Sequence, residues 1–153
     1  MSAEERLRRL GIELPEPPSP VASYVPTVVA EGLIFVSGQI PARAGGIPRL
    51  GQVGADLTLD EGVEEARFCA INVLAQLRAA AGSLDNIARV VRLGVFVASA
   101  PGFRHQPAVA NGASDLIVEV FGDIGRHTRA AVGVNELPLG APVEVEAIAM
   151  LER

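Results

Sequence analysis

The chain has no lysine and no tryptophan, and it has only one tyrosine and one cysteine among its 153 residues. All 13 basic residues are therefore arginines, and the formal net charge is −5. Because non-specific nucleic-acid binding needs clustered lysine and arginine to displace counterions, this composition argues against a nucleic-acid partner. The single cysteine, Cys69, excludes an intrachain disulfide and a cysteine-based zinc site. Its place in a helical pattern indicates a small core residue.

Long apolar runs are also missing. No stretch approaches the roughly 20 apolar residues that a membrane-spanning helix needs. The N-terminal sequence MSAEERLRRLG lacks the apolar core of a signal peptide, so we expect a cytoplasmic protein with no membrane partner. The two histidines, His105 and His127, do not have the spacing of a metal site, and we expect no metal and no organic cofactor.

The residues that are present indicate a globular protein, since 49% are hydrophobic and 20% are charged. Ser2 with Glu5, and Thr58 with Glu61, have the spacing of helix capping boxes. Glu31-Gly32 is typical of a hairpin turn. Periodicity and these signals predict a short N-terminal helix over 2–10, strands over 22–30 and 33–38, a helix over 59–81, a strand over 88–99, a helix over 107–121, and strands over 128–134 and 143–151.

The predicted order of elements is β-β-α-β-α-β-β after the N-terminal helix. This order favours an α+β sandwich, a mixed sheet with two helices packed on one face. We expect residues 1–20, the helix and a proline-rich connector, to precede one domain over 21–153. The segments VVRLGVFV and VEVEAIAML carry apolar residues on both sides, so the second sheet face needs a cover, and another subunit is the expected one.

The segment 38–57 predicts a long loop rich in glycine and proline, and such loops are often functional. It lacks the lysine and serine or threonine that end a phosphate-binding loop. Two interpretations stay open. The loop is a mobile rim, or its Arg43 and Arg49 steer anionic ligands.

The C-terminal strand places two carboxylates on one side. Side chains alternate across a strand, so Glu144 and Glu146 share a face with the apolar Ile148 and Met150. At least one glutamate should therefore be partly buried and need a partner. Arg129 is the candidate, with two alternatives. It pairs with one of these glutamates, or its planar fork of donors holds a ligand carboxylate.

Two stretches, YVPTVVAEGLIFVSGQIP and RAAVGVNELPLGAPVEVEAIAM, together with the intervening helix and strand, resemble the RidA (YjgF-like, endoribonuclease L-PSP) family over about residues 21–151. The resemblance implies a chorismate-mutase-like fold and a homotrimer with clefts between subunits. It also implies hydrolytic deamination of small enamine or imine carboxylates to 2-keto acids and ammonia, without a cofactor.

The resemblance also assigns roles. Arg129 matches the arginine that binds the substrate carboxylate, and Glu144 matches the glutamate that positions or activates water. The residues that match the lining of the cleft are Tyr24, Ser37, Gly38, Asn111 and Ala131. Ala131 departs from the cysteine that the family often has there, and the Gly125–Thr128 segment departs from a proline-containing lead into the arginine.

Three functions remain as hypotheses. The first is the deaminase, and the second is a non-catalytic trimer that binds a small carboxylate metabolite. The third, a ribonuclease, is disfavoured by the net acidity and the absence of lysine. His127 is either a general base or, as we favour, a surface or supporting residue beside Arg129. His105 is expected to be exposed.

Overall fold

The computed structural model describes residues 1–17 and 23–153. They form one five-stranded mixed sheet with strand order β1-β2-β5-β3-β4, in which only the β3–β4 pair is parallel. The expected boundary between residues 20 and 21 lies outside the described residues. The strands are β1 (Thr27–Ala30), β2 (Leu33–Gln39), β3 (Ile87–Ala98), β4 (Thr128–Val134) and β5 (Val143–Leu151).

The β1–β2 hairpin has the predicted turn, with positive φ angles at Glu31 (51°) and Gly32 (78°). Strand β1 begins at Thr27, however, so the prediction that 23–26 also belong to it is wrong. Pro26 explains the difference in part, since it has no N–H to donate to a ladder. Its carbonyl oxygen still accepts a hydrogen bond from the Ser37 amide at 2.9 Å, and this contact keeps residues 23–26 beside β2.

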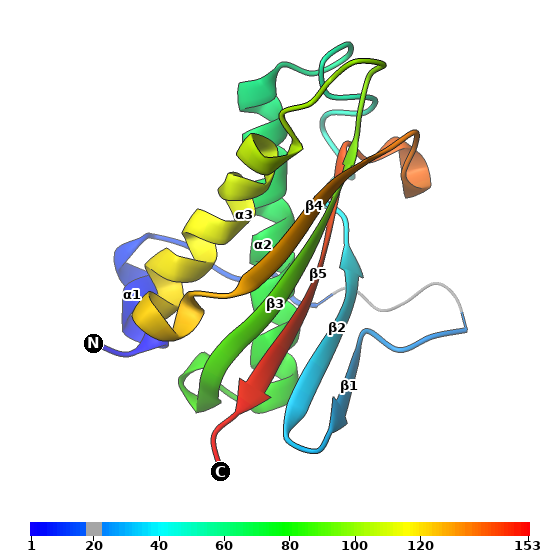
Figure 1. Ribbon diagram of the computed structural model, residues 1–153. Coiled ribbons are helices and arrows are strands. Elements are labelled where there is room, and N and C mark those ends of the chain that lie inside the picture. The colour runs from blue at the N-terminus through cyan, green and yellow to red at the C-terminus, as the bar shows by residue number, and fades with distance from the viewer. Residues whose placement is uncertain (18–22) are drawn as a thin grey trace.

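Three α-helices of the described chain lie on one side of the sheet (Figure 1). They are the short α1 (Ala3–Arg9), the long α2 (Leu59–Ala81) and α3 (Gln106–Phe121). The predicted bounds of α2 are confirmed: Thr58 and Glu61 form the capping box, and Gly82 ends the helix at a φ of 80°. Short 3-10 turns at Leu84–Asn86, Gly122–Gly125 and Pro138–Gly140 complete the connections.

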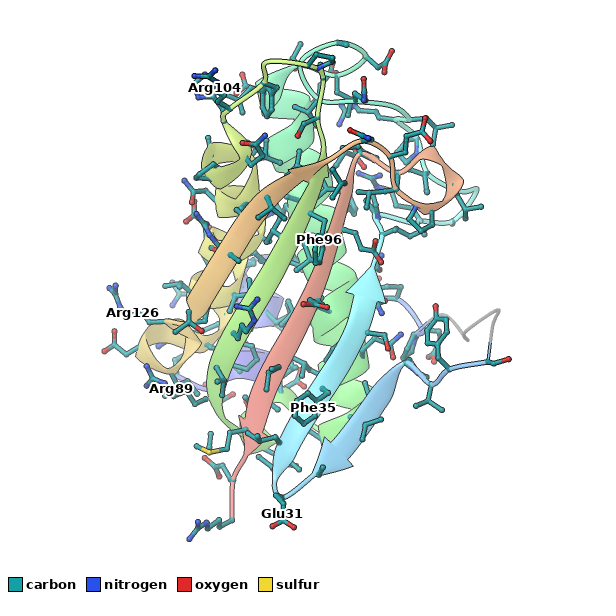
Figure 2. All side chains as sticks on the ribbon, turned by 45° about the vertical axis from the view of Figure 1, so that its right-hand side comes forward. Glu31, Phe35, Arg89, Phe96, Arg104 and Arg126 are labelled. Carbon is teal, nitrogen blue, oxygen red and sulfur yellow. The ribbon has the colours of Figure 1, made fainter. Side chains whose placement is uncertain are left out.

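The hydrophobic core lies between these helices and one face of the sheet. Strand β5 alternates as predicted, with Val143, Val145, Ala147 and Ala149 fully buried on the helix side. We call the other side the open face, because no described helix covers it (Figure 2). By strand register it carries Glu144 and Glu146 together with the apolar residues Val28, Phe35, Phe96, Val132, Ile148 and Met150.

The long loop before α2 is anchored by an ionic cluster that we call the loop clamp, formed by Arg43, Arg49, Glu64 and Glu65. Glu65 is fully buried, and Arg43 donates to both of its carboxylate oxygens at 2.9 and 3.1 Å. Arg49 contacts Glu64 at 2.6 Å and Glu65 at 3.1 Å. Both arginines are therefore held in ion pairs, which argues against the interpretation that they steer anionic ligands.

Candidate functional site

Arg129 lies on the edge strand β4, opposite Leu93 of β3, and its side chain turns toward α3. Its Nη1 donates to Asn111 Oδ1 at 2.9 Å and to Ser114 Oγ at 3.1 Å, and its Nη2 donates to the Pro107 carbonyl oxygen at 3.3 Å. We call these four residues the arginine nest. All three acceptors are neutral, and no described residue forms an ion pair with Arg129, so its positive charge is not compensated locally.

The hydrogen bonds of the nest leave one edge of the guanidinium available. An arginine offers five N–H donors in a fixed plane, and three of them are used by the nest. The remaining two are Nε–H and one hydrogen of Nη2, and they share one edge of the plane when Pro107 accepts the Nη2 hydrogen on the Nη1 side. A carboxylate accepts two parallel hydrogen bonds from such an edge. The nest therefore presents a charged fork suited to one carboxylate.

Glu144 lies on β5 in register with Phe96, on the open face (Figure 2 labels Phe96). The side chain is half-buried, and no hydrogen bond or ion pair to it occurs within the described ranges. Burial, together with the nearby charge of Glu146, raises the pKa of the Glu144 carboxyl above its ordinary value of 4.5. A carboxylate whose pKa is raised in this way is a better proton acceptor than a solvated one.

Gly38 makes room for this carboxylate. It lies in a bulge of β2, where the register with β5 shifts between Val36 and Gln39. A Cβ atom at Gly38 would collide with Glu144 Oε1. The φ of Gly38 is not positive, so the glycine is required by space and not by backbone conformation. A residue that matches the cleft of the resembled family thus directly contacts the candidate base.

The remaining residues expected near Gly38 come from two segments. Ser37 donates its hydroxyl hydrogen to the Val25 carbonyl oxygen at 2.9 Å, which holds the 23–26 segment against the start of the bulge. Tyr24 precedes Val25 and is 52% exposed. A hollow of about 250 Å³ on the open face is lined by residues that include Ser37, Arg92 and Glu146.

One alternative from the sequence is wrong within a protomer. Arg129 does not pair with Glu144 or Glu146, because the Arg129 side chain lies on the helix side of the sheet and both glutamates lie on the open face. Register decides this point: Arg129 shares a rung with Leu93 and Ala147, which are buried on the helix side. Glu144 shares a rung with Phe96 on the open face. Alternation along one strand could not reveal how β4 and β5 are aligned, because β3 lies between them.

Asn111 and Ala131 join the arginine half of the site. Asn111 is a member of the nest, and Ala131, two residues after Arg129, lies on the same helix-facing side and packs against the core. Cys69 is buried as expected, and burial raises the pKa of its thiol well above the ordinary value. His105 is exposed as expected.

Sequence reasoning missed Ser114. The hydroxyl of Ser114 contacts Arg129 and also His127 Nε2, at 2.9 Å. The available signal was its spacing of three residues from Asn111, which places both side chains on one face of a helix. His127 lies beside Arg129, as we favoured, and is half-buried.

Among the described residues, no group of three or more His, Cys, Asp or Glu side chains is arranged to hold a metal ion. No described helix is long and apolar enough to cross a membrane.

The sequence and the fold were compared with known proteins. Residues 4–151 match the family described as "YjgF/chorismate_mutase-like, putative endoribonuclease". The chain is 52% identical over 146 residues to protein TCP17 of Trypanosoma cruzi, covering 95% of this chain and 91% of that protein. The crystal structure of Atu1372 from Agrobacterium tumefaciens, described as of unknown function, has a TM-score of 0.90 at 46% identity, covering 98% of this chain and 94% of the other.

A more distant relative has a more informative name. The Escherichia coli K12 protein named "Putative reactive intermediate deaminase TdcF" is 30% identical over 139 residues, covering 91% of this chain and 95% of that protein. A crystal structure of E. coli TdcF with bound serine has a TM-score of 0.63 at 25% identity, covering 90% of this chain and 94% of the other.

Proposed function

Because the chain belongs to the YjgF (RidA) family, we propose that it hydrolyses small enamine or imine carboxylates to 2-keto acids and ammonia. The observation that carries this proposal is the arginine nest, which holds Arg129 by neutral acceptors and leaves its charged fork for a ligand. A relative at 30% identity has the name "Putative reactive intermediate deaminase TdcF", which supports the same reaction class.

The proposal requires two copies of the chain at each site. The Arg129 fork and the Glu144 carboxylate lie on opposite sides of one sheet, and a small substrate cannot contact both. If the β4–α3 edge of one protomer lies over the open face of its neighbour, both groups line one cleft. The apolar side chains of the open face, including Phe35 and Met150 at 41% and 40% exposure, would be covered in the same step. We propose a closed ring of three protomers, in accord with the resemblance to the RidA family.

The chemistry then follows from the two groups. The Arg129 fork binds the substrate carboxylate in two parallel hydrogen bonds and fixes the position of the imine carbon. Glu144 takes a proton from water as the oxygen attacks that carbon, and it returns this proton to the imine nitrogen. It then takes the hydroxyl proton of the resulting aminoalcohol and gives it to the amine as the carbon–nitrogen bond breaks. The products are a 2-keto acid and ammonia.

The second candidate function is a trimer that binds a small carboxylate metabolite without turnover. The nest supports it, since a charged fork in a cleft is sufficient for binding. The structure of TdcF with bound serine also supports it, because serine carries a carboxylate. The half-buried Glu144 carboxylate beside Gly38 favours the deaminase, because a site that only binds an anion gains nothing from a second negative charge nearby.

An imine-generating assay tests the proposed reaction. An L-amino-acid oxidase supplies 2-imino acids, semicarbazide captures imine that has not yet been hydrolysed, and the wild-type chain should reduce that capture. Arg129→Ala should abolish the effect. Glu144→Gln should keep carboxylate binding but lower turnover by a factor on the order of 10² or more.

Three outcomes are decisive. Full activity of Glu144→Gln would remove Glu144 from the mechanism. A wild-type chain that leaves the capture unchanged for several amino acids, yet binds pyruvate, would be a binding module. A monomer in sedimentation experiments that still shows turnover would contradict the two-copy site.

A further inference from the structure

We propose that Ser114 and His127 are positioning residues that direct the carboxylate-binding fork of Arg129. The inference rests on the proposed function, since it concerns how the same carboxylate site is built. Its basis is a continuous chain of hydrogen bonds from the backbone at Gly125, through His127 and Ser114, to Arg129.

The direction of each hydrogen bond in this chain follows from chemistry. The Gly125 carbonyl oxygen can only accept, so the His127 Nδ1 at 2.6 Å from it carries a proton. In a neutral ring Nε2 is then an acceptor, and it receives the hydroxyl hydrogen of Ser114 at 2.9 Å. With its own hydrogen used in this way, Ser114 Oγ turns a lone pair to Arg129 Nη1 at 3.1 Å.

The surroundings of His127 favour the neutral ring that this arrangement needs. Burial lowers the pKa of the imidazole below its ordinary value of 6.5, and the positive charge of Arg129 lowers it further, against an opposing contribution from the Gly125 hydrogen bond. His127 is therefore neutral at neutral pH. It orients the Ser114 hydroxyl without adding a second charge beside the fork.

The alternative state of Ser114 shows what His127 contributes. A serine inside a helix commonly donates its hydroxyl hydrogen to the carbonyl oxygen four residues earlier. For Ser114 that residue is Ala110, and rotation toward it would change the direction of the lone pairs that meet Arg129. His127 removes this option. Asn111 and Pro107 accept from Nη1 and Nη2 of the guanidinium, and Ser114 is the second acceptor on Nη1, so the direction of its lone pair affects how the guanidinium is held.

The effect is measured by calorimetry as the Kd for pyruvate, a 2-keto acid of the product class. Ser114→Ala and His127→Ala should each raise the Kd about fivefold, as expected for loss of one hydrogen bond. If His127 acts through Ser114, the double variant should bind no more weakly than Ser114→Ala alone. His127→Gln, whose side-chain oxygen can still accept from Ser114, should recover most of the affinity.

His105→Ala is the matched control, because His105 is the other histidine and lies exposed at the start of α3. It should leave the Kd unchanged. The proposal would be overturned if the double variant bound pyruvate more weakly by the sum of the two single effects. A Kd for His127→Ala equal to that of the wild type would also overturn it. In steady-state assays, a raised KM with an unchanged kcat would agree with positioning for binding. Equal decreases of kcat/KM in all variants, together with lowered thermal midpoints, would indicate a merely structural role.

A ligand-free measurement separates this inference from the proposed function. The Arg129 Nε–H resonance, assigned in ¹⁵N-labelled protein by its loss in Arg129→Ala, should shift or broaden in Ser114→Ala and His127→Ala but not in His105→Ala. If the wild-type chain shows no turnover but these changes occur, the deaminase fails and the inference stands. If the resonance is the same in all variants, the inference fails whatever the reaction is.

Discussion

Two regions of this protein combine arginine with glutamate, and they do so in opposite ways. In the loop clamp, Arg43 and Arg49 meet the buried Glu65 directly, and both charges are compensated by their partners. In the candidate site, Arg129 is held by neutral oxygens, and Glu144 lies on the other side of the sheet with no cationic partner among residues 1–17 and 23–153.

The difference separates a structural use of charge from a functional one. A buried carboxylate that already accepts three hydrogen bonds serves to hold the long loop before α2, and its full burial keeps it away from a ligand. An arginine fixed by neutral acceptors keeps both its charge and one free edge. The distinction depends on which atoms meet, since both regions contain the same residue types.

Replacing the buried carboxylate of the clamp should have the largest effect. Glu65→Gln leaves Arg43 and Arg49 without their shared counter-charge, and the free energy of unfolding should fall by about 3 kcal/mol. Urea unfolding measures this change. Glu64→Gln is the control, because the Glu64 side chain is 61% exposed and its loss should cost less than about 1 kcal/mol. Equal losses in the two variants would mean that the clamp is an ordinary surface ion pair.

Arg129→Lys should act on function and leave stability nearly unchanged. A lysine keeps the positive charge but is a point donor, so it cannot form the two parallel hydrogen bonds of the fork. We expect kcat/KM for imine hydrolysis to fall about 30-fold, with a thermal midpoint within about 2 °C of the wild type. A variant that retains full activity would show that charge alone, without the fork, accounts for binding.

Gly38→Ala tests the open-face half of the site. The added methyl group would collide with Glu144 Oε1 and displace the carboxylate, so kcat should fall about tenfold. Gly94→Ala is the matched control, because its Cβ would lie 2.7 Å from Oε1 of Glu146 and would disturb that glutamate instead. The comparison of kcat in the two variants decides which glutamate is the base. A larger loss in Gly94→Ala would transfer the role to Glu146.

The pH dependence of kcat should show the smallest change. Because the pKa of Glu144 is raised, its carboxyl gains a proton at a higher pH than an ordinary glutamate. Activity that needs the ionised form is therefore lost, as pH falls, already above pH 4.5. Glu146→Gln removes the neighbouring charge, which is the second cause after burial, so the acid limb should move to lower pH. A limb that moves to higher pH would exclude Glu144 as the titrating group.

The same pKa shift has a consequence for stability. Burial disfavours the charged form of Glu144 in the folded state, so its contribution to folding becomes less favourable as pH rises from 4.5 through the raised folded-state pKa. Glu144→Gln, which carries no charge, should remove this dependence, and unfolding midpoints measured between pH 4 and 7 would detect the difference.

Local signals were sufficient for much of the fold. The capping residues Thr58 and Glu61 with the terminal Gly82 predicted the bounds of α2, and strict alternation in β5 predicted which side of that strand is buried. These features depend on neighbours a few residues apart. The predicted start of β1 was wrong because the pairing of residues 23–26 depends on Pro26 and on its contact with Ser37, which lies eleven residues after Pro26 in the chain.

The site could be predicted only in part. Strand alternation made Arg129 and Glu144 candidates, and the resemblance assigned roles to them and to Gly38 and Asn111. Neither predicted that Arg129 contacts Asn111 or that Glu144 lies against Gly38. Ser114 was missed because its spacing of three residues from Asn111 gains a meaning only when Arg129 of β4 is placed beside both residues. The alternative that Arg129 pairs with Glu144 or Glu146 was wrong within one protomer for a related reason, since a difference of one residue in register exchanges the two faces of a strand.

The sequence by itself determined the order and most of the bounds of the helices and strands, the buried side of β5 and the absence of lysine. Each of these follows from residues that are near neighbours along the chain, or from composition alone. Only the tertiary structure decided that Arg43 and Arg49 are held in ion pairs while Arg129 keeps a free edge. Only the tertiary structure, likewise, put Arg129 and Glu144 on opposite sides of the sheet. Contacts between segments depend on strand order and register, and these are set by the packing of the whole chain and by no single segment.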